Sequence, residues 1–90
     1  MQGAMMTIEE GSQIRVIHGP VTVKCVTLMV VETPGQPLKY VLQHYDTFVL
    51  EVVGKEIILE KTHVSRSTAR AIRQAKKFIF EFEKEVEEKA

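Results

Sequence analysis

The sequence predicts an α+β fold, an antiparallel β-meander of about five strands with one long C-terminal helix packed on one face. Short apolar runs separated by turn residues fill residues 13–61, which is typical of strands joined by tight turns. A helical repeat of apolar residues then fills 65–89 without glycine or proline. We expect a single domain over residues 13–90, preceded by a flexible leader at residues 1–12.

The turn residues place the strands in order along the chain. Pro34 and Gly35 suit the two central positions of a type II turn. Gly54 suits the first position of a two-residue II′ hairpin, and Tyr45-Asp46-Thr47 is expected to form the turn before it. The strands are therefore expected at 13–18, 21–32, 38–44, 47–53 and 56–61.

The hairpin around Gly54 predicts a register and two unlike sheet faces. A two-residue loop pairs Val53 with Glu56, Val52 with Ile57, Glu51 with Ile58 and Leu50 with Leu59. The face covered by the helix would carry Phe48, Leu50, Val52, Ile57 and Leu59. The other face would carry Val49, Glu51, Val53, Glu56, Ile58 and Glu60, so it is half apolar and half acidic.

The helix has a clear start and a clear apolar stripe. Ser65 is expected to cap its N-terminus. We expect Ile72, Ile79 and Phe82 to form the helix side of the core. At 1.5 Å per residue the helix is about 36 Å long, so its last turns should extend beyond a domain about 30 Å across.

Charge is sorted along this helix against its own dipole. From Lys61 to Lys77 there are six cations and no acid, and from Phe78 to Ala90 there are five glutamates and two lysines. Because a helix N-terminus favours anions, the basic run calls for a partner outside the helix. The candidates are an acidic sheet face, an antiparallel copy of the same helix, and a nucleic-acid phosphate backbone.

Two of these candidates name residues. Nucleic-acid phosphates would contact the basic stripe on the helix, which is formed by Arg66, Arg70, Arg73 and Lys77. A homodimer would bring the glutamates of one helix to this stripe on the other, with Phe80 near the two-fold axis. The dimer interface would consist of Phe80, Phe82, Val86, Glu81, Glu85 and Glu88.

Other function classes lack a signature. Ser65 or Ser67 with His63 and Asp46 would form a hydrolase triad, but no Gly-x-Ser-x-Gly elbow is present and Ser65 is explained as a cap. The remaining candidates, His18, His44, Asp46 and His63, lack a recognised metal-ligand spacing. We therefore expect no enzyme activity, no metal and no cofactor.

The single cysteine and the absence of a long apolar run predict the compartment of the protein. We expect Cys25 to be a small buried residue inside a strand, and one cysteine fits a reducing compartment. No apolar run approaches the roughly 20 residues of a membrane span, and no secretory signal is present, so a cytoplasmic protein is expected.

Two segments carry a family resemblance. They are Tyr45-Asp46-Thr47-Phe48-Val49 and the helix start from Ser65 to Ile72. With the intervening glycine turn and strand, they resemble short uncharacterised proteins of tailed-phage genomes. The resemblance covers about the C-terminal half of the chain and implies a phage or mobile-element origin without implying an activity.

Together these observations predict a non-enzymatic interaction or accessory protein that forms homo-oligomers through its C-terminal helix. The alternative is a nucleic-acid-binding accessory protein that uses the basic N-terminal half of the same helix. Net charge is zero, so binding to a polyanion would have to come from this local patch rather than from the whole molecule.

Overall fold

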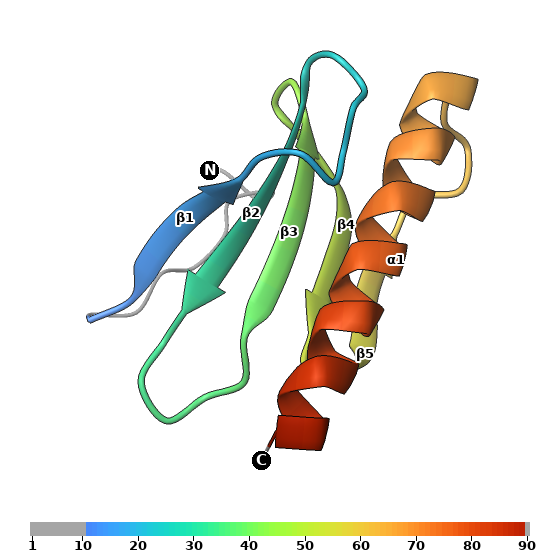
Figure 1. The fold of residues 1–90 in the computed structure, drawn as a ribbon. Coiled ribbons are helices and arrows are strands. Elements are labelled where there is room, and N and C mark those ends of the chain that lie inside the picture. Colours follow the sequence, from blue (N-terminus) through green and yellow to red (C-terminus); the bar gives the residue numbers. More distant parts are fainter. Residues whose placement is uncertain (1–10, 90) are drawn as a thin grey trace.

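The protein forms a five-stranded antiparallel sheet with one helix on one face (Figure 1). A computed structural model describes the backbone of residues 11–89 and the side chains of residues 11–82. The strands lie side by side in chain order, which confirms the predicted α+β meander. Most of the predicted leader, residues 1–10, lies outside the described residues. The elements are β1 (Gln13–Ile17), β2 (Val26–Glu32), β3 (Lys39–His44), β4 (Thr47–Val53), β5 (Glu56–Glu60) and α1 (Arg66–Lys89).

Three tight turns connect β2 to β5 as their residues predict. Gly35 has φ 79°, and the Gln36 N–H donates to the Thr33 carbonyl oxygen at 3.0 Å, as in a type II turn. Gly54 has φ 61°, which the first position of a II′ turn requires. Tyr45 turns the chain between β3 and β4 with φ 56°. Glycine and local turn chemistry therefore set where these four strands meet their turns.

Strand β2 starts later than predicted. The apolar run 21–32 was expected to be one strand, but β2 begins at Val26 because Cys25 has a left-handed backbone with φ 64°. The residues before this turn cross toward the helix, where the side chain of Gln74 accepts a hydrogen bond from the Thr22 N–H at 3.0 Å. The prediction was wrong because the turn contains neither glycine nor proline.

A β-bulge changes the predicted register of the last hairpin. Val52 pairs with Ile57 as expected, but Glu51 pairs with Leu59 instead of Ile58. The extra residue, Ile58, has no opposite residue on β4, and every position beyond it moves to the other face. Leu59 was therefore wrongly assigned to the helix-covered face.

The bulge brings a carboxylate under the helix. Glu60 now lies opposite Leu50 on the covered face, and its carboxylate is 3.2 Å from the ammonium nitrogen of Lys76 on α1. A second bulge, between β3 and β4, brings Val49 into the buried cluster beneath α1, with 3 % of its surface exposed. The predicted placement of Glu60 and Val49 on the uncovered face was wrong for the same reason.

The core lies between α1 and the three central strands. Ile72 and Ile79 are 4 % and 0 % exposed, which confirms them as the helix side of the core. Their neighbours across the interface are the buried side chains of Leu28, Val30, Tyr40, Leu42, Leu50 and Val52.

Phe82 lies at the margin of this core. It is 37 % exposed, and its ring meets the edge of the Tyr40 ring with 6.5 Å between centroids. The prediction that Phe82 forms the helix side of the core together with Ile72 and Ile79 was therefore wrong. We expect Phe82→Ala to lower the free energy of unfolding by about 1–2 kcal/mol, against about 3–5 kcal/mol for a fully buried Phe. Urea titration measures this change, and a loss above about 3 kcal/mol would contradict the exposed position.

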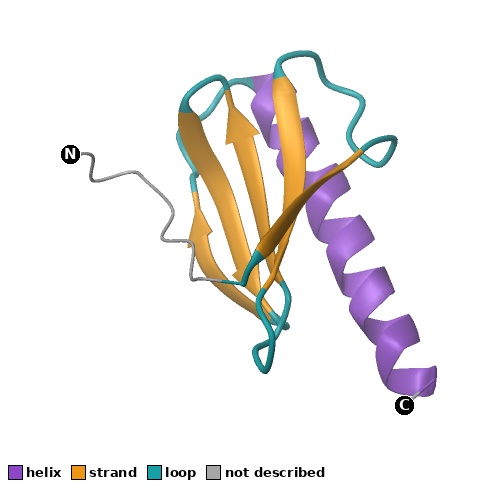
Figure 2. Ribbon diagram, turned by 90° about the vertical axis from the view of Figure 1, so that its left-hand side faces the viewer, coloured by secondary structure: helices purple, strands orange, loops and turns teal. Residues whose placement is uncertain are grey.

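Helix α1 covers one face of the sheet and crosses it obliquely (Figure 2). Its last turns lie clear of the strands, as its length predicted. No described helix lies on the opposite face, which carries the Lys39–Glu51 ion pair at 2.7 Å. The described residues therefore present three surfaces: the outward side of α1, a groove beside its second half, and the sheet face opposite α1, on which Val31 and Val41 are buried.

Candidate nucleic-acid interface

The start of α1 is fixed by a side-chain cap. The Ser65 hydroxyl accepts a hydrogen bond from the Thr68 N–H at 3.2 Å and lies 3.0 Å from the Thr68 hydroxyl. Thr68 is only 2 % exposed, so its second hydrogen bond to Ser65 satisfies a polar group in the core. The predicted cap is confirmed, and it fixes where the basic run begins on the helix.

The side chains proposed for a hydrolase triad are not joined in the structure. His63 and Asp46 are exposed, and Asp46 lies in the β3–β4 turn. Among the described residues, no hydrogen bond links His63 to Ser65 or Ser67. The hydroxyl of Ser65 is instead used by the cap.

The cations of α1 are sorted by the direction in which they face. Lys76 lies toward the sheet, where its ammonium is 3.2 Å from the Glu60 carboxylate. The other four cations of residues 66–77, which fall within about 60° of one another around the helix, are all exposed. We call them the basic face: Arg66, Arg70, Arg73 and Lys77.

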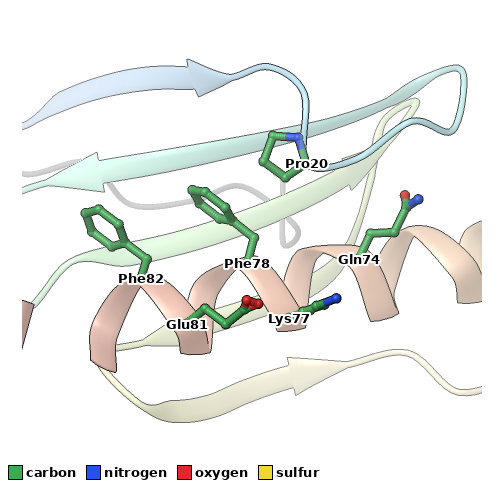
Figure 3. Close-up of a pocket in the computed structure, with 6 residues that line it drawn as sticks. All are labelled: Pro20, Gln74, Lys77, Phe78, Glu81 and Phe82. Carbon is green, nitrogen blue, oxygen red and sulfur yellow. The ribbon is translucent and has the colours of Figure 1, made fainter. Parts of the chain in front are cut away.

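The basic face has no ion pair among the described side chains, although Glu81 lies one turn from Lys77 on the same side of α1 (Figure 3). Elsewhere the sheet neutralises its cations, with Arg15 2.8 Å from Glu32 and Lys39 2.7 Å from Glu51. The first turn of α1 contains no acidic residue either. Among the described residues of the basic run, Lys76 pairs with Glu60 of the predicted acidic face, whereas the four side chains of the basic face pair with no described residue of that face.

A groove lies beside the second half of α1, next to the β1–β2 connection (Figure 3). The rings of Phe78 and Phe82 stand nearly parallel, 6.0 Å apart with an interplanar angle of 14°. Figure 3 shows both rings on the sheet side of the helix and Lys77 and Glu81 on the outward side. The groove has a volume of about 420 Å³ and meets a second hollow of about 340 Å³ at the two rings. The sequence did not reveal this groove, because nothing in it shows that Pro20 of the β1–β2 connection lies beside Phe78 and Phe82.

The residues predicted for a helix-paired dimer are only partly described. Phe80 is half-buried and packs against the core cluster, so it does not project from the outward side. Glu81 is exposed. The side chains of Val86, Glu85 and Glu88 lie outside the described residues. The outward side of α1 therefore shows no apolar anchor among the described side chains.

Cys25 is exposed, contrary to the predicted burial. It contacts Tyr45, whose N–H donates to the Cys25 carbonyl oxygen at 3.2 Å. A side-chain hydrogen bond with the Cys25 thiol raises the pKa of Tyr45 from its usual value. Both residues have positive φ, at 64° and 56°, so this contact joins two turns that each contain a residue in the left-handed conformation.

The described part of the chain shows neither a cluster of metal ligands nor a membrane-spanning helix. Among those residues, no three His, Cys, Asp or Glu side chains gather as metal ligands. None of the described helices combines the length and the hydropathy needed to cross a membrane. No family model, curated protein or solved structure matches this chain.

Proposed function

We propose that this chain is a non-enzymatic accessory protein that binds the phosphate backbone of a nucleic acid through the basic face of α1. The proposal rests on a difference in ion pairing between the cations of the protein. Arg15, Lys39 and Lys76 have carboxylate partners at 2.7–3.2 Å, whereas the four residues of the basic face have none among the described side chains.

The dimensions of the basic face suit a polyanion. Its first and last residues, Arg66 and Lys77, are eleven positions apart, which is about 17 Å along a helix. Duplex DNA carries one negative charge per about 1.7 Å of its axis, so several phosphates lie within that length. The positive end of the helix dipole lies at the same end as the basic face and adds to the attraction.

The chemistry of the basic face favours phosphate contacts over base reading. Arginine guanidiniums make bidentate hydrogen bonds with phosphate oxygens. The rings of Phe78 and Phe82 lie on the sheet side of α1, whereas Lys77 lies on the outward side (Figure 3). We therefore expect binding with little sequence preference, as for proteins that contact mainly the backbone.

A salt titration tests this proposal. With four cations on phosphates, the logarithm of the binding constant should fall against the logarithm of the salt concentration with a slope of roughly −3 to −4. Fluorescence anisotropy with a mixed-sequence duplex and a single strand measures that slope. An absence of binding to both at low salt would overturn the proposal.

A homodimer through α1 is the second candidate function. It is favoured by the order of charges, because antiparallel helices would place Arg73, Arg70 and Arg66 opposite Glu81, Glu85 and Glu88 of the copy. Exposed ion pairs contribute only about 0–1 kcal/mol each. With Phe80 packed against its own core, such a dimer would lack the apolar contact that the sequence predicted for it.

A further inference from the structure

The two edges of the sheet are unequally protected. Edge strand β5 contains the bulge at Ile58 and a glutamate at each end, and Glu60 is also held by Lys76 of the helix. Bulges and charges of this kind block strand pairing between molecules. Edge strand β1 pairs with β2 without a bulge over all five residues and contains no proline, glycine or acid.

Strand β1 also exposes apolar side chains next to its open backbone edge. Ile14 and Val16 are 42 % and 47 % exposed. They lie opposite Val31 and Met29 of β2, on the sheet face that α1 leaves uncovered. Between them Arg15 points to the helix-covered face, where Glu32 holds its guanidinium at 2.8 Å. Among the described strands, none pairs with the outer edge of β1, which has apolar neighbours and an arginine that is already paired with Glu32.

We propose that β1 is a docking edge for a second copy of this chain, whose β1 adds antiparallel to it and extends the sheet to ten strands. A two-fold axis perpendicular to the sheet keeps each face on its own side. With the axis at Arg15, all five residues of the strand are paired, and Ile14 lies opposite Val16 of the second copy.

The residue order of β1 favours β1 of a second copy as the strand that pairs with it. The segment Ile14-Arg15-Val16 is apolar, charged and apolar when followed in either direction. An antiparallel copy therefore matches apolar to apolar twice on the uncovered face. The two Arg15 side chains meet on the other face, each already paired with its own Glu32, so their repulsion is reduced. Because only five residues pair per chain, we expect a weak dimer with a Kd in the micromolar range, as small interfaces give.

This pairing would place two basic faces on one side of the assembly. The two-fold axis leaves both α1 helices on the same face of the extended sheet. Each helix lies over the central strands, so at about 4.8 Å per strand the two helices would be roughly 25–35 Å apart. This distance is close to one turn of B-DNA, about 34 Å. The bivalent use of the dimer rests on the proposed function, but the strand pairing itself does not.

Sedimentation velocity of the full chain without nucleic acid tests the pairing. At high salt, which screens ion pairs between helices, wild type should shift from monomer to dimer between low and high micromolar concentration. Val16→Lys and Ile14→Lys should each remain monomeric at the highest concentration, because a charge is placed on the docking edge. The matched control is Ile57→Lys on the opposite edge, a position 39 % exposed, which should dimerise like wild type. Circular dichroism melts check that every variant is folded.

Three results would overturn the proposal. They are a wild-type chain that stays monomeric over the whole range, a folded β1 variant that still dimerises, and a dimer that dissociates as salt is raised. The last result would instead support pairing through α1. Loss of nucleic-acid binding by a chain that still dimerises through β1 would overturn only the proposed function.

Discussion

Neutralising two arginines of the basic face, in the variant Arg70→Gln/Arg73→Gln, is expected to weaken nucleic-acid binding roughly 100-fold at about 50 mM salt. The reason is counterion release, since each phosphate contact with slope near −0.9 contributes a factor of roughly 10–15 at that salt concentration. Both side chains are exposed and without described partners, so their loss should leave the fold unchanged. Anisotropy titrations of variant and wild type with the same duplex measure the change.

The matched control removes the same charge elsewhere on the molecule. The single variant Lys55→Gln, compared with the single variant Arg70→Gln, changes an exposed lysine in the turn between β4 and β5, at the other end of β5 from the start of α1. It should weaken binding by a small factor only, because distant charges are screened beyond about 10 Å at ordinary salt. The salt slope should fall by about one for Arg70→Gln and stay unchanged for the control. Equal effects of the two variants would mean that net charge, and not the basic face, causes binding.

Truncating a helix residue of the core is expected to have the largest effect on stability. Ile79 is 0 % exposed beneath the middle of α1, so Ile79→Ala should lower the free energy of unfolding by about 2–5 kcal/mol. That is a large fraction of the total stability of a domain of this size. Urea titration followed by circular dichroism measures the loss. Ile57→Ala, at a position 39 % exposed on β5, is the control and should cost less than about 1.5 kcal/mol.

The turns and the helix start were predictable because their chemistry is local. Gly35 and Gly54 supply the positive φ that their turns need, and Ser65 supplies the acceptor for an N-terminal N–H. These requirements depend only on residues within three positions along the chain. Residue type and position therefore predict them without knowledge of the tertiary structure.

The errors arose where the local sequence fits two backbone conformations equally well and tertiary packing selects one of them. The apolar residues Ile57, Ile58 and Leu59 fit either face, so nothing in their order shows that Ile58 is the bulged residue. The run that ends in β2 contains a turn at Cys25 without a turn-forming residue, and its valines suggested a continuous strand. Each of these errors lies next to a contact with α1. Glu60 pairs with Lys76 beyond the bulge, and Thr22 is hydrogen-bonded to Gln74 before the turn at Cys25.

The candidate site was predictable only in part for a related reason. Helical periodicity placed Arg66, Arg70, Arg73 and Lys77 on one side, and the structure shows all four exposed. The same periodicity could not show that Lys76, beside them in sequence, is neutralised by a strand residue moved across the sheet by the bulge. The burial of Phe80 depends on the oblique crossing of α1, which no spacing within the helix encodes.

The strand order of the sheet has a consequence for how fast the chain can reach this structure. Because the order β1-β2-β3-β4-β5 is also the order along the sequence, every strand pairing closes a short loop. Folding rates of small domains fall as the mean sequence separation of contacts rises, and adjacent hairpins keep that separation low. The entropy cost of loop closure is therefore small for each hairpin, because its two strands are adjacent in the chain. Helix α1 packs on a sheet formed entirely by residues that precede it in the sequence. A five-stranded sheet built this way is expected to fold on the faster side of β-rich domains, in about milliseconds.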